Sequence, residues 1–376
     1  MKPVLFVTGH APLDRVGAFS RLHEVENVEF ALFGGPSKHG GPALARDLPF
    51  PHRYVRQHQP AALAASGRYR AVVCSTGGRL ALGATWAGTR HAKLPLILWT
   101  SLWAHPRSAA HALSFLALRR LYRSADAVVT YGPHVSAYVS ARGARNVHIA
   151  PQAVDNDFWS APEIGPPSNP AWPEEAKTKF LFVGRPVREK GLRVLTEAWR
   201  TAGLQAPTAA LVLVGAGSSP PRVPVGGAVG RVCDNATDGS SEGTVLRIGP
   251  VSPLELRNLY AACDVLVVPS IPTGTFREPW GLVVNEAMNR GLPVIASDAV
   301  GAAAGGLVRD RRNGLVVPAG DSDALAEAID RLASQPALRG RLGEAGAQDV
   351  RAFTYDAWAA GFSGALATLG LARGHW

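Results

Sequence analysis

Short runs of apolar and β-branched residues recur along the first half of the chain, separated by longer stretches with helical spacing. Polar residues, Gly or Pro bound each run, as expected of buried strands. The predicted strands are Val4–Thr8, Val28–Phe33, Ala71–Ser75, Leu96–Thr100, Ala127–Thr130 and Val147–Ala150. Because helical stretches such as Ala109–Arg123 separate these strands, we expect a parallel sheet covered by helices on both faces.

A second series of the same kind follows a proline-rich stretch, Trp159–Lys179. Its predicted strands are Phe180–Val183, Ala210–Val214, Val245–Ile248, Val265–Val268 and Val294–Ala296, with Gly314–Val317 as an edge strand. The length of 376 residues also favours two domains. We expect a first domain at 1–158, a linker at 159–178, a second domain at 179–352 and a C-terminal helix within 353–376 that packs back on the first domain. Residues 218–243 are rich in Gly, Ser and Pro and predict a long loop or hairpin insertion.

Two glutamates eight positions apart, Glu278 and Glu286, follow one of the apolar runs in the sequence EPWGLVVNE. Pro279 suits the first turn of a helix, where its missing N–H costs nothing, and Gly291 suits the end of that helix. The pattern predicts Glu278 just before the helix and Glu286 about two turns inside it. A helix start can hold a phosphate, and carboxylates accept hydrogen bonds from hydroxyls. For an isolated pair, a loop cap and a solvated helix face would be the simpler interpretation, but the flanking sequence favours a ligand site.

A second loop with candidate chemistry, GRPVREKG, runs from Gly184 to Gly191 after a predicted strand. Ligands of open α/β sheets lie outside the carboxyl ends of the strands. Gly184 lets the backbone approach a ligand, and Arg185 and Lys190 offer positive charge to a diphosphate. By themselves the two cations would be interpreted as solvated loop residues. A further glycine turn at 215–217 lacks the third glycine of a nucleotide-binding loop because Pro220 occupies that position, so it predicts a tight turn.

These segments occur in the order seen in glycosyltransferase family 4, which the chain resembles over most of residues 179–330. The block from Glu278 to Glu286 carries most of this resemblance, whereas the first half resembles the family chiefly in its layout. The resemblance implies an α/β fold of the GT-B type, with two Rossmann-like parallel-sheet domains facing a central cleft. It also implies a retaining, metal-independent glycosyltransferase that uses a nucleotide-diphospho-sugar as its substrate and needs no cofactor.

The resemblance further implies a role for each candidate residue. Arg185 and Lys190 would bind the diphosphate, Glu286 the ribose hydroxyls and Glu278 the hydroxyls of the donor sugar. His105, just after the strand Leu96–Thr100, would contact the sugar or stabilise developing charge, although a His before Pro in a loop is more often a surface residue. The other donor-binding candidates are Gly184, the amides of Gly281, Leu282 and Val283, the base-lining Gly249 and Val251, and Gly17, which would open a helix near the phosphates.

The expected reaction moves a hexosyl or N-acetylhexosaminyl group, from a UDP-sugar in preference to a GDP-sugar, to an acceptor hydroxyl in glycan, glycolipid or glycosylated-metabolite biosynthesis. A double displacement needs a carboxylate close to the anomeric carbon, and the first half offers no obvious candidate. Two D-x-D strings begin at Asp155 and Asp321; the first lies beside the interdomain linker, we interpret the second as a helix cap, and we predict no metal requirement. The alternative function is a non-catalytic sugar-nucleotide-binding protein or a membrane-peripheral scaffold.

Of the net charge of +10, +9 belongs to the first half, where residues 1–170 hold 18 Lys and Arg against 9 Asp and Glu. This balance indicates an acidic partner or simply an Arg-rich proteome. The helix Ala109–Arg123 combines leucines with arginines and either contacts an anionic membrane or packs as an ordinary surface helix. No recognition motif supports nucleic acid as a partner. Three widely spaced cysteines and no apolar run long enough to span a membrane favour a cytoplasmic bacterial protein, with peripheral contact at the inner face of the plasma membrane.

Overall fold

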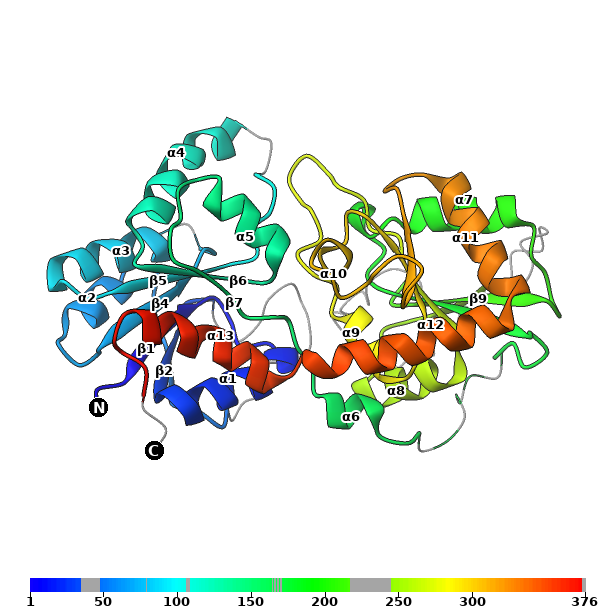
Figure 1. Cartoon of the computed structure of the whole chain (residues 1–376), viewed down its shortest axis with the longest axis horizontal. Coiled ribbons are helices and arrows are strands. Elements are labelled where there is room, and N and C mark those ends of the chain that lie inside the picture. The colour runs from blue at the N-terminus through cyan, green and yellow to red at the C-terminus, as the bar shows by residue number, and fades with distance from the viewer. Residues whose placement is uncertain are drawn as a thin grey trace, which may run out of the picture.

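The chain forms two parallel sheets that lie side by side along the long axis of the molecule, each flanked by helices (Figure 1). This computed structural model describes residues 1–34, 48–78, 80–105, 109–163, 165, 167, 169, 171–216 and 245–373, with 109–113 described in backbone only. The expected α/β fold with two Rossmann-like parallel sheets is therefore confirmed. The insertion predicted at 218–243 lies outside the described residues.

The first sheet has seven strands in the order β3-β2-β1-β4-β5-β6-β7. Its strands are β1 (Val4–Thr8), β2 (Val28–Leu32), β3 (His52–Tyr54), β4 (Ala71–Ser75), β5 (Leu96–Thr100), β6 (Ala127–Thr130) and β7 (Val147–Ile149). The helices of this half are α1 (Leu13–Glu26), α2 (Pro60–Ala65), α3 (Ala81–Ala92), α4 (Ala109–Ser124), α5 (Pro133–Ser140) and α6 (Asn156–Ser160). In β1, Val4 and Phe6 face one core and Leu5 and Val7 face the other. Burial on both faces explains why the strands read as continuous apolar runs.

The strand β3 is the element of this sheet that the apolar pattern does not predict. It has three residues, His52, Arg53 and Tyr54, none of them buried. It pairs only with β2, at the edge of the sheet. An edge strand of this kind needs no apolar run, because solvent covers much of it.

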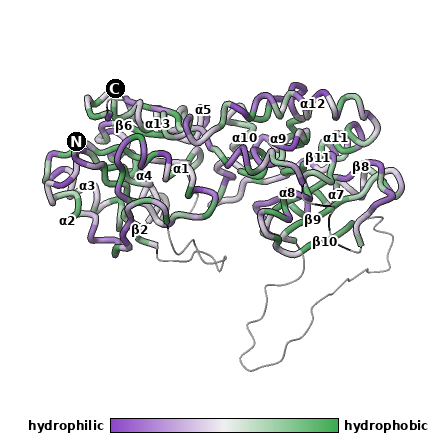
Figure 2. The backbone as a smooth tube through the Cα atoms, turned by 90° about the horizontal axis from the view of Figure 1, so that it is seen from below, coloured by the Kyte–Doolittle hydropathy of each residue, from purple (hydrophilic) through white to green (hydrophobic). Residues whose placement is uncertain are grey.

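The second sheet has six strands in the order β10-β9-β8-β11-β12-β13, which leaves β13 at an edge as predicted. The strands are β8 (Thr178–Val183), β9 (Ala209–Val214), β10 (Val245–Ile248), β11 (Val265–Val268), β12 (Val294–Ser297) and β13 (Gly314–Val317). The helices are η1 (Arg188–Lys190), α7 (Leu192–Ala202), α8 (Pro253–Ala262), α9 (Val283–Asn289), α10 (Gly301–Ala304), α11 (Ser322–Ser334), α12 (Pro336–Asp349), η2 (Val350–Ala352) and α13 (Tyr355–Thr368). The strand β9, next to the edge strand β10, is buried along its whole length and is drawn in the hydrophobic colour in Figure 2.

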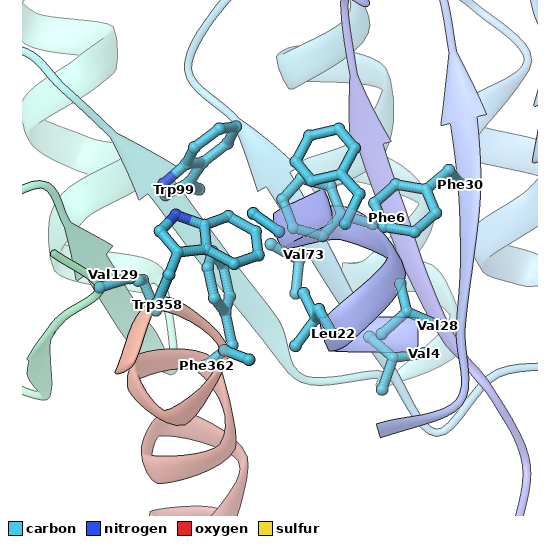
Figure 3. Packing of buried hydrophobic residues seen from close by; sticks show 14 of the residues in the cluster. Val4, Phe6, Leu22, Val28, Phe30, Val73, Trp99, Val129, Trp358 and Phe362 are labelled. Carbon is cyan, nitrogen blue, oxygen red and sulfur yellow. The ribbon is translucent and has the colours of Figure 1, made fainter. Parts of the chain in front are cut away.

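The C-terminal helix α13 leaves the second sheet and packs on the first. Trp358 and Phe362 of α13 are fully buried among Phe6, Phe19 and Trp99, with ring centroids 4.6–6.2 Å apart (Figure 3). Helix α13 thus completes a core whose other buried members lie between Val4 and Ala153. Among the described residues, none of the helices has the length and apolar character needed to cross a membrane.

Candidate functional site

Glu278 lies on the loop between β11 and α9, but the helix starts later than the sequence predicts. Helix α9 begins at Val283, with Leu282 at its N-cap, rather than at Pro279. Glu278 forms an isolated bridge with Val300, which keeps the chain extended there, and Gly281 then turns the chain at a φ of +93°. The prediction that Glu286 lies two turns inside the helix is therefore wrong, because Glu286 belongs to the first turn.

The side chain of Trp280 explains why helix α9 begins later than predicted. Trp280 is buried, and its Nε1 donates to Asn285 Oδ1 at 2.8 Å. The Asn285 side chain is fully buried, and its Nδ2 donates to the carbonyl oxygen of Gln152 at 2.9 Å. The residues between the two glutamates thus fix the shape of the loop. The sequence analysis did not single out Trp280 and Asn285, although both stand inside the block it emphasised.

Glu278 is paired with Lys190. Lys190 Nζ lies 2.6 Å from Glu278 Oε2, and Ser270 Oγ donates to the same oxygen at 3.3 Å. The Glu278 side chain is 8% exposed and that of Lys190 is 24% exposed. A carboxylate removed from water in this way needs a cation and hydrogen bonds. The structure therefore brings together two of the predicted site residues from separate loops.

Gly191 allows the Lys190 loop to lie against the end of β11. Its φ is +69°, and a Cβ there would lie 1.9 Å from the carbonyl oxygen of Pro269. The amide of Ile271 also donates to Glu189 O at 3.0 Å, which ties the two loops together. Gly184 lies earlier on this loop, where a Cβ would be 3.7 Å from Lys190 Cδ. Only a glycine at position 191 lets the backbone approach so closely.

Arg185 is exposed on the same loop, and within the described part of the chain its side chain has no hydrogen-bond or ion-pair partner. The structure thus places it near Lys190 in the chain but in no contact with Glu278. A solvent-exposed guanidinium at the carboxyl edge of the sheet is available to a ligand with negative charge.

Glu286 is buried, and the Tyr260 hydroxyl donates to its Oε2 at 2.8 Å. Burial raises the pKa of Glu286 to about 7, the Tyr260 hydrogen bond lowers it, and the nearby Asp14 carboxylate raises it. Burial and the Glu286 charge together raise the pKa of Tyr260 well above its usual value, so the phenol keeps its proton. Tyr260 lies on α8 and was missed by the sequence analysis, since nothing in the helical pattern marks it as polar.

The remaining donor-binding candidates lie at or near the same edge of the second sheet. Gly281, Leu282 and Val283 lead into α9, and Val284 N and Glu286 N already donate to the carbonyls of Gly281 and Leu282. Gly249 and Val251 follow β10. A Cβ at Gly249 would meet no described atom within 4 Å, whereas Val251 packs partly against the second core.

Gly17 has a different surrounding from the one predicted. Helix α1 begins at Leu13, so Gly17 lies inside the helix and does not open it. A Cβ on Gly17 would lie 2.2 Å from Tyr355 Cε2 of α13. The glycine is thus required by the close packing of two helices.

His105 contacts its own half of the molecule. Its Nδ1 lies 3.5 Å from the Tyr138 hydroxyl, and its ring meets Phe115 edge-on at 5.1 Å. Two other aromatic residues of the first half, Trp103 and His134, instead contact the Glu278 loop, with Trp103 Nε1 3.1 Å from Glu278 O. The sequence analysis missed both.

The two D-x-D strings serve as helix caps. Asp155 accepts from Phe158 N at the start of α6, and Asp321 accepts from Asp323 N and Ala324 N at the start of α11. The second assignment confirms the predicted cap. Among the described residues, no group of three or more His, Cys, Asp and Glu side chains is arranged to hold a metal ion.

Residues 169–349 match the sequence profile of the family described as Glycosyl transferases group 1. The resemblance to these glycosyltransferases is therefore confirmed over this part of the chain. The chain is 38% identical over 118 residues to the D-inositol 3-phosphate glycosyltransferase of a Nocardioides species, a match that covers 30% of this chain and 24% of that protein. It is 29% identical over 274 residues to the alpha-maltose-1-phosphate synthase of Mycolicibacterium smegmatis, covering 69% of this chain and 66% of that protein. The match to the first relative thus spans about a quarter of that relative's length.

Solved structures of the same architecture cover almost the whole chain. Anabaena Alr3699/HepE in complex with UDP and glucose has a TM-score of 0.69 at 17% identity, covering 98% of this chain and 100% of that chain. The sucrose-phosphate synthase of Thermosynechococcus elongatus has a TM-score of 0.66 at 21% identity, covering 98% and 99%. These likenesses show the GT-B fold.

Proposed function

We propose that the protein is a retaining, metal-independent glycosyltransferase that moves a hexosyl or N-acetylhexosaminyl group from a nucleotide-diphospho-sugar to an acceptor hydroxyl. The observation that carries the proposal is the Lys190–Glu278 ion pair together with the buried Glu286–Tyr260 pair. Both pairs lie on elements of the second sheet within the matched family region. An exposed cation, Arg185, lies on the same loop as Lys190.

Each group has a role that its surroundings support. Lys190 Nζ has three donors, so it can hold Glu278 and still bind a diphosphate oxygen together with Arg185. Glu286, once ionised, accepts hydrogen bonds from the two ribose hydroxyls, while Tyr260 keeps the carboxylate oriented. Glu278 accepts from hydroxyls of the donor sugar. The amides of Gly281, Leu282 and Val283 lie beside the diphosphate, Gly184 lets it approach the backbone, and Gly249 and Val251 line the base.

The proposed reaction is a front-face displacement. The acceptor oxygen forms its bond to the anomeric carbon while the bond from that carbon to the diphosphate breaks, and the acceptor proton passes to the departing diphosphate. Glu278 is held by Lys190 and Ser270, so it acts as a sugar-binding group rather than a nucleophile. Catalysis then consists of positioning the reactants and of stabilising the diphosphate charge by Lys190 and Arg185. His105 is assigned to the sugar side of this centre, and His105→Ala tests that role.

We propose that UDP is the nucleotide diphosphate of the donor. Anabaena HepE, which shares the fold, was solved with UDP-glucose. The acceptor is proposed to bind to the first half of the chain, which carries most of the positive net charge. An acceptor with a phosphate or other anionic group fits this charge. The D-inositol 3-phosphate glycosyltransferases among the relatives are named for such an acceptor.

Helix α4 is the proposed contact with an anionic membrane, at the cytoplasmic face. Arg119, Arg120 and Arg123 are exposed on it, and Leu116 beside them is 68% exposed. Basic side chains next to an exposed apolar one suit a surface of anionic lipid. Sedimentation with phosphatidylglycerol vesicles and with phosphatidylcholine vesicles tests this contact: equal binding to both would contradict it.

The main test is titration calorimetry with UDP-, GDP- and ADP-sugars, followed by the release of nucleotide in the presence of candidate acceptors. We expect UDP-sugar binding that is lost in Glu286→Ala, and slow release of UDP even without an acceptor. Binding without any release of nucleotide under all conditions would favour the non-catalytic sugar-nucleotide-binding protein. The absence of binding to every nucleotide sugar would refute the proposed function.

A further inference from the structure

Two aromatic side chains of the first half hold the main chain of the loop that carries Glu278. Trp103 Nε1 donates to Glu278 O at 3.1 Å, and His134 Nε2 lies 3.3 Å from Pro279 O. Because a carbonyl oxygen only accepts, His134 must carry its proton on Nε2. Trp103 follows β5, and His134 lies in the first turn of α5, directly after β6. Consecutive carbonyls of the second half are thus bound by ring N–H groups from the segments that follow the neighbouring strands β5 and β6.

The rings that make these hydrogen bonds also pack against one another and against the loop. Trp103 and His134 meet edge-on with centroids 5.0 Å apart, and His134 lies 6.1 Å from the ring of Trp280. The Arg277 guanidinium lies 4.4 Å from the centroid of the Trp103 ring, a cation–π contact. The residues immediately before and after Glu278 are therefore both in contact with the first half.

His134 is suited to this place as a neutral ring. Burial lowers its pKa, and the hydrogen bond to Pro279 O opposes that effect. Its Nδ1 is buried and has no partner among the described residues, so a second proton on the ring would be left unpaired.

The two halves of the molecule hold different parts of Glu278. The second half holds the carboxylate, through Lys190 and Ser270. The first half holds the backbone of the same residue through Trp103. The position of the carboxylate therefore depends on both halves, whereas Glu286 and its partner Tyr260 belong to the second half alone.

We propose that Trp103 and His134 are positioning residues that fix the Glu278 loop when the two halves of the molecule are together. This role rests on the proposed function, because the loop is fixed for the donor sugar. Without the two N–H donors, a nucleotide still binds to the second half, but Glu278 no longer meets the sugar hydroxyls in a single position. The loss therefore falls on turnover and leaves nucleotide affinity in place.

Hydrogen exchange on the full chain tests, without any substrate, whether Trp103 and His134 hold the Glu278 loop. The amide of Gly301 donates to Glu278 O at 3.1 Å and that of Ala302 to Trp280 O at 2.8 Å, so both amides report on the loop. In the double variant Trp103→Phe/His134→Ala we expect these amides to exchange about tenfold faster, since two hydrogen bonds are lost. Trp103→Phe alone keeps the ring under Arg277, and it should give a smaller acceleration.

Matched controls remove similar groups elsewhere in the first half. Trp86→Phe removes an indole N–H that donates to Ser124 Oγ at 3.1 Å, and His148→Ala removes a half-buried histidine that contacts Asn146. Neither should change exchange at Gly301 and Ala302. His134→Gln places an amide N–H near the position of Nε2 and should restore part of the protection.

The kinetic measurement separates positioning from binding. In the double variant we expect kcat to fall about tenfold while the Kd of UDP changes less than about twofold, and His134→Gln should recover part of kcat. Unchanged exchange at Gly301 and Ala302 would show that Trp103 and His134 do not hold the loop. Faster exchange with unchanged kcat would overturn the role of the two residues in turnover. If the wild type binds no nucleotide sugar while the double variant still exchanges faster, the contact stands, and the proposed function and the positioning role both fail.

Discussion

Glu286 should make the unliganded protein less stable at neutral and basic pH, and Glu286→Gln should remove that cost. In the unfolded chain the carboxyl group ionises near 4.5, and in the folded protein burial raises its pKa to about 7. Below pH 4.5 the group is protonated in both states and costs nothing. Above pH 7 it is ionised in both states, and the folded state bears the full cost of a buried charge. Folding stability due to this group therefore falls as the pH rises from about 4.5 to about 7.

The size of the effect follows from the two pKa values. One pKa unit corresponds to about 1.4 kcal/mol, so the cost of ionised Glu286 at pH 8 is about 3 kcal/mol. Glu286→Gln has nearly the same shape and can still accept from the Tyr260 hydroxyl. We expect it to be about 3 kcal/mol more stable than the wild type at pH 8, and to differ by less than about 1 kcal/mol near pH 5.

Urea unfolding at pH 5, 6, 7 and 8, with and without UDP, measures this directly. The wild type should gain UDP affinity as the pH rises through about 7, because the ribose hydroxyls need the ionised carboxylate, while Glu286→Gln should bind weakly at every pH. Glu26→Gln is the contrasting control. Glu26 is buried with Arg70 at 2.8 Å, so its loss should lower stability. A difference between wild type and Glu286→Gln that does not change with pH would refute the reasoning.

Three further changes test the rest of the site. Tyr260→Phe removes the hydrogen bond that lowers the pKa of Glu286, so the pH midpoint of UDP binding should move up, with a loss of about 1 kcal/mol in stability by urea unfolding. Lys190→Ala should lower turnover about 100-fold or more, and wild-type turnover would contradict the diphosphate role. Gly17→Ala should lower the free energy of unfolding by about 1–3 kcal/mol, and with it the melting temperature, because of the clash with Tyr355, with partial recovery in Gly17→Ala/Tyr355→Ala. A loss of UDP affinity without a change in melting temperature would instead favour contact between Gly17 and the phosphates.

Most strands of both sheets could be predicted because a parallel strand that is buried on both faces is a continuous apolar run in the sequence. The residues Val4–Val7 and Val265–Val268 are buried on both faces of their sheets, and every one of them is apolar. The strand His52–Tyr54 lies at an edge of its sheet and has no such apolar run. The start of α9 was misplaced for a related reason. Pro279 is compatible with a first helical turn, but the burial of Trp280 and the bridge to Val300 hold the chain extended there.

By itself the sequence determined the two α/β halves and the block from Glu278 to Glu286, because strand periodicity and the composition of a binding loop are local properties of the chain. Only the tertiary structure decided which side chains surround the two glutamates. Lys190 is 88 residues from Glu278, Trp103 is 175 residues away and Tyr260 is 26 residues from Glu286. The packing of Gly191 on Pro269 and of α13 on the first sheet brings distant segments together. Contacts of this kind depend on the fit of surfaces that no local pattern encodes.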